Sequence, residues 1–168
     1  ISQMDMNVYQ AKFSGSDRPA FFAAANWFAN GMQSIFLQDA NSLIMPARDL
    51  TRVLVALRRA FPSLGRITSY ARSHTVTKRS VAELAALRQA GLDRIHVGIE
   101  SGSDEVLRRV QKGATAERHV QAGQRIKDAG IELSAYVMPG LGGRELTNAH
   151  AAETAAVLRA IDPAFVRL

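Results

Sequence analysis

The chain has 168 residues, of which 47% are hydrophobic and 21% charged, and its formal net charge is +6. This composition predicts one folded domain and excludes a disordered chain, which would combine low hydrophobicity with high net charge. No apolar stretch approaches the roughly 20 residues that cross a bilayer, and no signal-peptide pattern opens the sequence, so we expect a cytoplasmic protein. The chain has no cysteine, which excludes disulfides, thiol catalysis and cysteine-ligated metal centres built from its own residues.

Strand and helix patterns alternate along the chain. Short apolar runs typical of β-strands start roughly thirty residues apart, the period of repeated βα units, at 34–39, 66–70, 94–100, 132–138 and 165–168. Helical patterns lie between them at 48–61, 80–91, 115–130 and 148–161. Ser80 and Glu83 form a capping box for a helix that ends at Gly91, and Thr115 can cap the next helix, which ends at Gly130.

This alternation predicts an α/β fold with a parallel sheet covered by helices, because parallel neighbours need a long crossover. Continuous apolar character at 35–37 and 137–138 favours strands buried on both faces. A doubly wound sheet and a barrel both fit this order. No glycine-rich phosphate loop follows the first run, which favours part of a (β/α) barrel with about five parallel strands.

In parallel α/β folds, ligands bind beyond the carboxyl ends of the strands. The residues that follow the predicted strands are therefore the site candidates, and we expect them to face one cavity: Gln38, Asp39, Asn41, Tyr70, Arg72, Glu100, Ser101, Met138, Gly140 and Leu141. Two of these carboxylates have a competing structural interpretation. Glu100 could instead cap the helix that starts near Ser103, and Asp39 could form a turn with Asn41.

The remaining candidates are weaker. The GLGG turn at 140–143 could bring backbone close to a ligand, but it is not the dinucleotide-binding pattern. His150 and Glu153 lie three apart on a predicted helix; without a third ligand we expect them at the surface rather than on a metal. His96, inside an apolar strand, is expected to be structural, with its hydrogen bonds satisfied. We therefore assign no catalytic or metal-binding residue.

Taken together, several segments resemble the core of radical SAM proteins, in the group near the oxygen-independent coproporphyrinogen oxidases and Elp3-like enzymes. They are FLQDANSLIMP (36–46), RITSYA (66–71), ELAALRQAGLDRIHVGIESGSDEVLRRVQKGAT (83–115), KDAGIELSAYVMPGLGG (127–143) and IDPAFVRL (161–168). The resemblance implies a partial (β/α)6 barrel, with residues 1–168 as a truncated core that holds the second to sixth strands.

The resemblance also implies cofactors and site roles. In this family a CxxxCxxC loop after the first strand binds a [4Fe–4S] cluster, and S-adenosylmethionine (SAM) on it is cleaved to a 5′-deoxyadenosyl radical with electrons from a donor such as flavodoxin or ferredoxin. Residues 38–41 fall where the family binds the amino group of SAM, Glu100 and Ser101 at the ribose, and 138–141 at the adenine. Residues 1–9 depart from the cluster-loop pattern, so the cysteines either precede this sequence or are lost.

Three functions fit these observations. The first is part of a radical SAM enzyme that is inactive by itself. The second is a cluster-free barrel that binds or scaffolds, with an anionic or RNA partner attracted by the +6 charge. The third is an ordinary metal-dependent or acid–base barrel enzyme that uses Asp39 and Glu100. The substrate cannot be deduced from the sequence.

Overall fold

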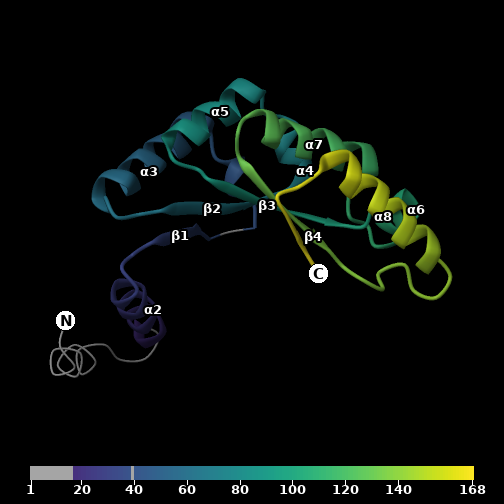
Figure 1. The fold of residues 1–168 in the computed structure, drawn as a ribbon, viewed down its shortest axis with the longest axis horizontal. Coiled ribbons are helices and arrows are strands. Elements are labelled where there is room, and N and C mark those ends of the chain that lie inside the picture. Colours follow the sequence, from purple (N-terminus) through teal and green to yellow (C-terminus); the bar gives the residue numbers. More distant parts are fainter. Residues whose placement is uncertain (1–16, 39) are drawn as a thin grey trace.

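The computed structural model describes residues 17–38 and 40–168, which form one parallel sheet with helices packed against it (Figure 1). Within these residues the strand order is β1-β2-β3-β4-β5, and every neighbouring pair is parallel. The strands are β1 (Ser34–Leu37), β2 (Arg66–Ala71), β3 (Arg94–Glu100), β4 (Glu132–Val137) and β5 (Phe165–Arg167). The predicted α/β class, the five strands and their order are confirmed.

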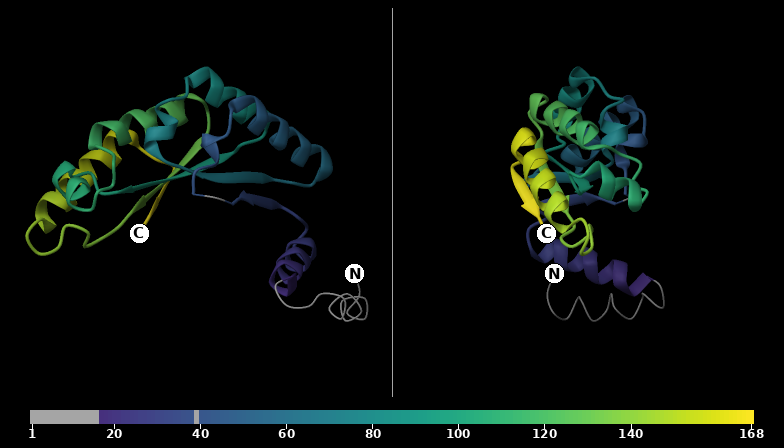
Figure 2. Two further views of the ribbon diagram at one scale, coloured as in Figure 1. Left: turned by 180° about the vertical axis from the view of Figure 1, so that it is seen from behind. Right: turned by 90° about the vertical axis from the view of Figure 1, so that its right-hand side faces the viewer.

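The helices connect successive strands. They are α2 (Asp17–Ala29), the 3-10 turn η1 (Ser42–Ile44), α3 (Ala47–Ala60), α4 (Ser73–Val76), α5 (Val81–Ala90), α6 (Asp104–Arg109), α7 (Ala116–Asp128) and α8 (Thr147–Ile161). Figures 1 and 2 show α3, α5, α7 and α8 on the same face of the sheet, while α2 lies apart beyond the start of β1. No helix among the described residues is long and apolar enough to cross a membrane.

Within residues 17–38 and 40–168, no helix covers the opposite face of the sheet (Figure 2). Phe36 and Tyr136 are only partly buried, and Met138 lies just past β4 with 50% of its surface exposed. The expectation that these strands are buried on both faces is therefore wrong. The apolar run misleads because aromatic side chains on the open face pack against one another across the strands instead of against helices.

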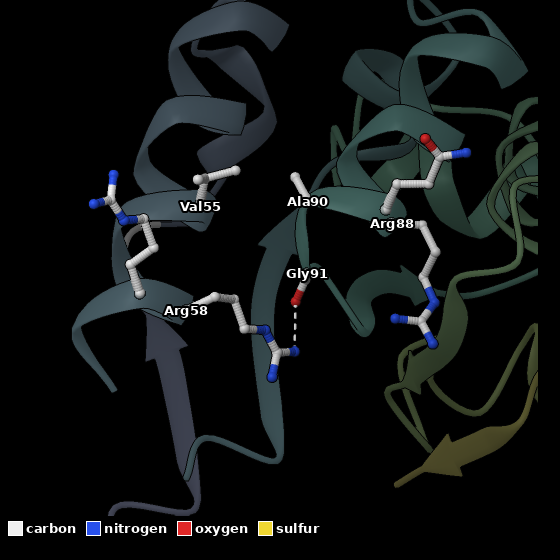
Figure 3. A pocket seen from close by; sticks show the side chains of 7 residues that line it. Val55, Arg58, Arg88, Ala90 and Gly91 are labelled. Carbon is white, nitrogen blue, oxygen red and sulfur yellow. Dashed lines mark hydrogen bonds between the residues drawn. The ribbon is translucent and has the colours of Figure 1, made fainter. Parts of the chain in front are cut away.

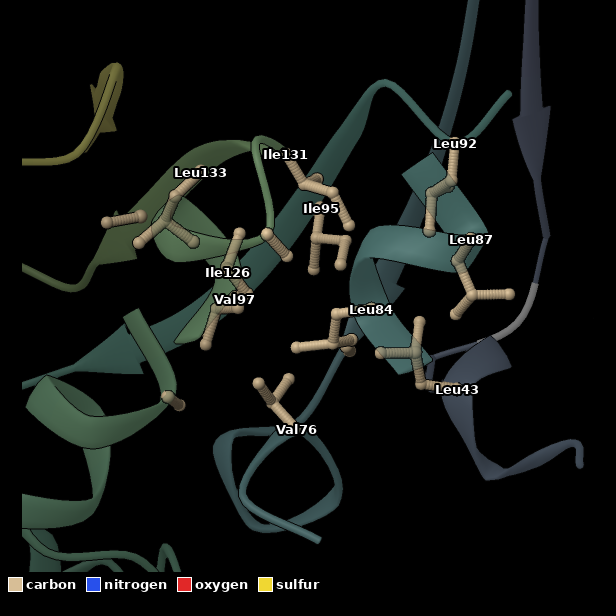
Figure 4. Packing of buried hydrophobic residues seen from close by; sticks show 14 of the residues in the cluster. Leu43, Val76, Leu84, Leu87, Leu92, Ile95, Val97, Ile126, Ile131 and Leu133 are labelled. Atoms are coloured by element: carbon tan, nitrogen blue, oxygen red, sulfur yellow. The ribbon is translucent and has the colours of Figure 1, made fainter. Parts of the chain in front are cut away.

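The hydrophobic core lies between the sheet and the helices (Figure 4). Ile95 and Val97 point from β3 toward Leu84 of α5 and Ile126 of α7, and each is at most 2% exposed. Full burial of one such side chain contributes roughly 1.5–3 kcal/mol. This packing fixes the strands relative to one another and thereby fixes the positions of their ends.

Local signals set the helix ends as expected. The Ser80 hydroxyl accepts from the Glu83 amide at 3.1 Å, while the Glu83 carboxylate accepts from the Ser80 amide at 2.9 Å. Gly91 ends α5 with φ 116°, a left-handed conformation that a side chain would strain. The Thr115 hydroxyl accepts from the Arg118 amide at 3.2 Å and starts α7. The predicted capping box and both predicted helix starts are confirmed.

The amino ends of the strands are held by one carboxylate. Asp93 accepts from Arg58 Nη2 at 2.5 Å, from Arg88 Nη1 at 2.7 Å and from the Ile67 amide at 2.8 Å. A hollow of about 470 Å³ lies beside these arginines, between α3 and α5 (Figure 3). Arg58 also donates to the Gly91 carbonyl at 2.9 Å, the dashed line in Figure 3. Because the guanidiniums of Arg58 and Arg88 are occupied by protein acceptors, they stabilise this end of the sheet.

Candidate functional site

A cleft of about 1310 Å³ lies at the opposite end, beyond the carboxyl ends of β1 to β4. Small-molecule sites usually occupy about 300–1,000 Å³, so this cleft has room for a cofactor and part of a substrate. Of the predicted site residues, the structure brings the following into its wall: Gln38, Tyr70, Arg72, Glu100 and Met138. The predicted convergence of four strand ends on one cavity is therefore present in the structure.

The other predicted residues are placed differently. Asn41, Ser101, Gly140 and Leu141 do not line the cleft, and Asp39 lies outside the described residues. Asn41 instead ties two segments together: its amide nitrogen donates to Thr75 Oγ1 at 2.8 Å, and its Oδ1 accepts from the Arg72 amide at 3.1 Å. These bonds fix the start of α4 next to η1.

Glu100 is the last residue of β3 and the carboxylate among the described residues of the cleft wall. Its Oε1 accepts from Lys112 Nζ at 3.2 Å, and its side chain is 23% exposed. Its φ of 65° is left-handed, and the register with β4 shifts between Gly98 and Glu100. The carboxylate lies on the same face of β3 as Gly98 and lines the cleft, where it bonds Lys112 rather than the backbone of α6. The alternative that Glu100 caps the following helix is therefore wrong.

Space for this carboxylate depends on Gly98. A Cβ at residue 98 would overlap Glu100 Oε1 and lie 3.2 Å from Lys112 Nζ. Glycine in a strand interior often marks a close approach of this kind. The missing side chain of Gly98 thus leaves the space that the Glu100–Lys112 pair occupies in the wall of the cleft.

Ser101 faces away from the cleft, into the protein. It is fully buried, and its hydroxyl lies 2.8 Å from Nδ1 of His150 on α8. His150 is only 6% exposed, so the expectation that it lies at the surface is wrong: the amphipathic pattern of α8 is masked by its many alanines. No cluster of three potential metal ligands occurs among residues 17–38 and 40–168, and His150 with Glu153 forms none.

A row of rings crosses the open face of the sheet below the cleft. Phe36 and Tyr70 have ring centroids 4.9 Å apart, Tyr70 and His96 5.5 Å, and His96 and Tyr136 5.8 Å. A hydrogen bond with Tyr136 raises the pKa of Tyr70. Tyr70 and Tyr136 both line the cleft, so it has an aromatic floor. The sequence analysis missed Tyr136, although its alternation with Ala135 and Val137 on a predicted strand places it on the open face.

His96 does not have the satisfied hydrogen bonds that were expected. Its Nδ1 is buried and has no hydrogen-bond partner among the described residues. Burial, and then the positive charges of Arg167, Arg94 and Arg66, lower the pKa of His96. The partners of His96 in the sheet are Tyr70 on β2 and Ser134 on β4, and the Ser134 hydroxyl accepts from Arg167 Nε at 3.2 Å instead of bonding the imidazole.

The cleft also has a buried serine–histidine pair that the sequence analysis did not single out. Ser73 Oγ lies 2.7 Å from His119 Nδ1, and both side chains are at most 3% exposed. Burial, and then the nearby Lys112, lower the pKa of His119 to about 4, so this ring is neutral near pH 7. Such a pair stiffens the wall below the cleft. The two residues are 46 positions apart, so no sequence spacing signals their contact.

The fold and the site together define a class of protein. Parallel βα units, with a polar cleft beyond the carboxyl ends of the strands and a stabilising network at the amino ends, make this chain part of a (β/α) barrel. A family model described as the Radical SAM superfamily matches residues 22–155. The chain belongs to the radical SAM superfamily.

Sequence relatives are similar over part of the chain. The tRNA uridine(34) acetyltransferase of Methanocaldococcus infernus is 30% identical over 67 residues, which are 40% of this chain and 12% of that protein. The 4′-phospho-dehydrooxetanocin synthase of Priestia megaterium is 46% identical over 44 residues, 26% of this chain and 6% of that protein. The matched segments thus span a small part of each relative.

Solved structures share the fold. The cobalamin-dependent S-adenosylmethionine radical enzyme OxsB, with aqua-cobalamin bound, has a TM-score of 0.59 at 23% identity, covering 84% of this chain and 21% of that chain. Archaeal Elp3 of Methanocaldococcus infernus has a TM-score of 0.55 at 18% identity, covering 74% of this chain and 33% of that chain. The predicted Elp3-like resemblance and the TIM-like barrel architecture are confirmed.

Proposed function

We propose that this chain forms part of a radical SAM enzyme and binds S-adenosylmethionine in the cleft beyond β1 to β4. The observation that carries the proposal is Glu100, held in a strained conformation with its carboxylate turned into the cleft of a family member. Residues in rare backbone conformations cluster at functional sites, since the surrounding structure must hold them there. When bound with a reduced [4Fe–4S] cluster, SAM supplies a 5′-deoxyadenosyl radical for substrate modification.

The cleft suits this cofactor. Glu100 can accept hydrogen bonds from both ribose hydroxyls, and bonds to a charged acceptor are the stronger kind. Gln38 and Asn41 flank the position proposed for the amino group, and Met138, 50% exposed at the end of β4, offers an apolar contact for the adenine. Ser101, Gly140 and Leu141 contribute by shaping the loops behind these contacts. Tyr70 and Arg72 also line the cleft and are proposed to contact SAM or the substrate.

The residues present do not fit a [4Fe–4S] cluster. The chain has no cysteine, and the described residues contain no group of three histidine or carboxylate ligands. Cluster ligands must therefore come from outside this sequence, and we propose that the electron donor, such as a flavodoxin or ferredoxin, acts there. A cluster-free barrel that only binds its ligand is the second candidate, and the missing cysteines are what favour it.

RNA is the substrate class that we propose to test first. Two archaeal relatives, both named tRNA uridine(34) acetyltransferase, are 30% identical to this chain over 67 and 64 residues. The net charge of +6 suits a polyanion, because phosphate neutralisation releases counterions. In the described wall of the cleft, Arg72 and Arg118 add positive charge that no carboxylate of that wall balances, since Glu100 is paired with Lys112.

The test is binding of SAM, followed by its cleavage. Isothermal titration calorimetry of the intact protein that contains this chain, purified without oxygen, should show SAM binding that Glu100→Ala weakens by about tenfold and Glu117→Ala on α7 leaves unchanged. Dithionite should then yield 5′-deoxyadenosine, measured by chromatography. A folded protein that does not bind SAM would overturn the proposal. Binding without cleavage, in a protein free of iron, would establish the cluster-free module.

A further inference from the structure

Two loops carry the proposed cofactor contacts, and both rest on α8. Residues 101–103 follow Glu100 at the end of β3, and residues 138–143 begin with Met138 at the end of β4. The two strand ends are already joined by a backbone hydrogen bond of 3.0 Å from the Met138 amide to the Glu100 carbonyl. His150, in the second turn of α8, lies between the loops and bonds to both of them.

The hydrogen bonds of His150 form a continuous chain. Its Nε2 lies 3.1 Å from the Met138 carbonyl, which can only accept, so Nε2 carries the hydrogen. In the tautomer with this hydrogen on Nε2, Nδ1 accepts from the Ser101 hydroxyl at 2.8 Å, and that hydroxyl accepts in turn from the Ser103 amide at 3.0 Å. One imidazole therefore fixes the distance between the end of β4 and the loop after β3. The position of the ring hydrogen on Nε2 is assigned from the hydrogen-bond pattern.

Two glycines show how closely the loops approach the helix. A Cβ at Gly102 would overlap the Glu153 carbonyl oxygen and lie 2.6 Å from Thr154 Cα, and the Gly102 amide donates to Thr154 Oγ1 at 2.8 Å. A Cβ at Gly142 would lie 3.0 Å from His150 Cβ. The start of α8 is thus a platform on which both loops are seated.

None of these groups touches the cleft. Ser101, Thr154 and His150 are at most 6% exposed, and none lines the cavity, whereas Glu100 and Met138 on the attached loops do line it. Partners that act behind the contacting residues typically hold them in place, and their loss weakens binding without removing a contact. His150 therefore affects ligand binding only by holding Glu100 and Met138 in position.

We propose that His150 is a positioning residue that sets the spacing of the ribose-side and adenine-side loops of the cofactor cleft, with the hydrogen of its imidazole on Nε2. This inference rests on the proposed SAM binding for its functional consequence. Its structural part, the coupling of the two loops, stands independently of any ligand and has its own measurement.

The first test needs no cofactor. In the intact protein without SAM, hydrogen exchange followed by NMR should speed up at the Gly102 and Ser103 amides in His150→Ala. The acceptors of these amides, Thr154 Oγ1 and Ser101 Oγ, remain but lose the imidazole that lies 3.4 Å and 2.8 Å from them and holds them in place. Val157→Ala on the same helix truncates a buried residue of the hydrophobic core, 6% exposed, whose apolar side chain offers these amides no acceptor, and should leave both amides protected. Nitrogen-15 shifts of the wild-type ring should report hydrogen on Nε2. Equal exchange in both variants, or hydrogen on Nδ1 alone, would overturn the inference.

The second test measures the consequence. His150→Ala should raise the SAM dissociation constant by about tenfold in calorimetry, the effect of one or two lost buried hydrogen bonds. His150→Gln, whose amide can still donate to the Met138 carbonyl, should recover part of the affinity, and Val157→Ala should bind as wild type. If His150→Ala does not fold, Ser101→Ala replaces it. Wild-type protein that fails to bind SAM would contradict the proposed function. Wild-type affinity in His150→Ala, or in Ser101→Ala where it replaces that variant, would contradict the role of His150.

Discussion

Lys112 donates to the Glu100 carboxylate at 3.2 Å and joins the loop after α6 to the end of β3, so the carboxylate of the cleft wall is presented in a fixed orientation. Glu100 adopts φ 65° and Gln111, next to Lys112, adopts φ 52°, so the backbone is left-handed on both sides of this contact. Gln111 lies just past the end of α6, where a left-handed residue is a common helix ending, closed here by the bond from the Lys112 amide to the Leu107 carbonyl at 2.9 Å. The backbone strain at this contact therefore lies at Glu100.

Gly98→Ala should weaken binding with little effect on folding. The added Cβ would overlap Glu100 Oε1 and approach Lys112 Nζ to 3.2 Å, and both are flexible side-chain ends that can move aside. We expect the SAM dissociation constant to rise by about tenfold and the free energy of unfolding to change by less than about 1 kcal/mol. Calorimetry and urea unfolding measure the two quantities.

Gly102→Ala is the contrasting variant, since its Cβ would lie 2.6 Å from Thr154 Cα, a backbone atom that cannot move aside. It should lower the free energy of unfolding by about 2 kcal/mol or more. If Gly98→Ala is destabilised as strongly as Gly102→Ala, or binds SAM as wild type, the gap beneath Glu100 has no role in orienting the carboxylate.

Removal of the Glu100 side chain should reveal the strain at its backbone. At φ 65° a glycine is unstrained, whereas any residue with a Cβ incurs a penalty of about 1–2 kcal/mol. Glu100→Gly should therefore be more stable than Glu100→Ala by about 1 kcal/mol in urea unfolding, although both lose the carboxylate. At the exposed helical position Gln121 the order should reverse, because glycine weakens a helix. The same order at both positions would mean that residue 100 is not strained in solution.

The sequence was sufficient to predict the strands, the capping box at Ser80 and the strand-end location of Glu100. Each of these depends on neighbours within a few residues: an apolar run, a serine three positions before a glutamate, or a carboxylate that directly follows a buried strand. The sheet order followed because repeated βα units of this period leave few connections possible.

Contacts between distant segments could not be predicted. Ser101 follows Glu100 and was expected to face the same ligand, but its hydroxyl lies on the opposite side of the chain and contacts His150, 49 residues away. Strand alternation separates Ser101 from Glu100, as it places Tyr136 on the open face, but it does not identify His150 as the partner. Lys112 reaches the cleft only because the loop after α6 meets the end of β3. Tertiary packing sets such contacts, and no periodicity encodes them.

Stability should fall in acid because of His119. Its pKa is about 4 in the folded protein and 6.5 as the ordinary value, so the unfolded chain binds the proton more readily. The stabilisation is therefore complete above pH 6.5 and is lost as the pH falls from 6.5 toward 4. Between pH 7.5 and 4.5, wild type should lose roughly 2 to 3 kcal/mol more unfolding free energy than His119→Gln. The lowered pKa of His96 acts in the same direction in both proteins and cancels.

Urea unfolding at the two pH values makes this comparison. The glutamine variant keeps an amide that can bond the Ser73 hydroxyl but cannot take up a proton, so its stability at pH 7.5 should stay near that of wild type. An equal loss of stability in the two proteins would show that His119 is not the group that titrates. The acid sensitivity would then have to come from the paired carboxylates elsewhere in the fold.

Asp93 should be needed for folding but not for binding, because it lies at the amino ends of the strands, opposite the cleft. It accepts from Arg58, Arg88 and the Ile67 amide, and its side chain is 18% exposed. Asp93→Asn leaves two partly buried guanidiniums without a carboxylate and should lower the unfolding free energy by about 2–3 kcal/mol. Asp162→Asn, which breaks an ion pair in which the aspartate is 89% exposed, should change it by less than about 1 kcal/mol.

Both aspartate variants should bind SAM with wild-type affinity in calorimetry at a temperature where they are folded. A barrel of this kind keeps stability and ligand binding at opposite ends of its strands, so a large change at one end should leave the other intact. A weakened affinity in Asp93→Asn alone would show that the arginine network at the amino ends reaches the cleft through β3, the strand that links Asp93 to Glu100.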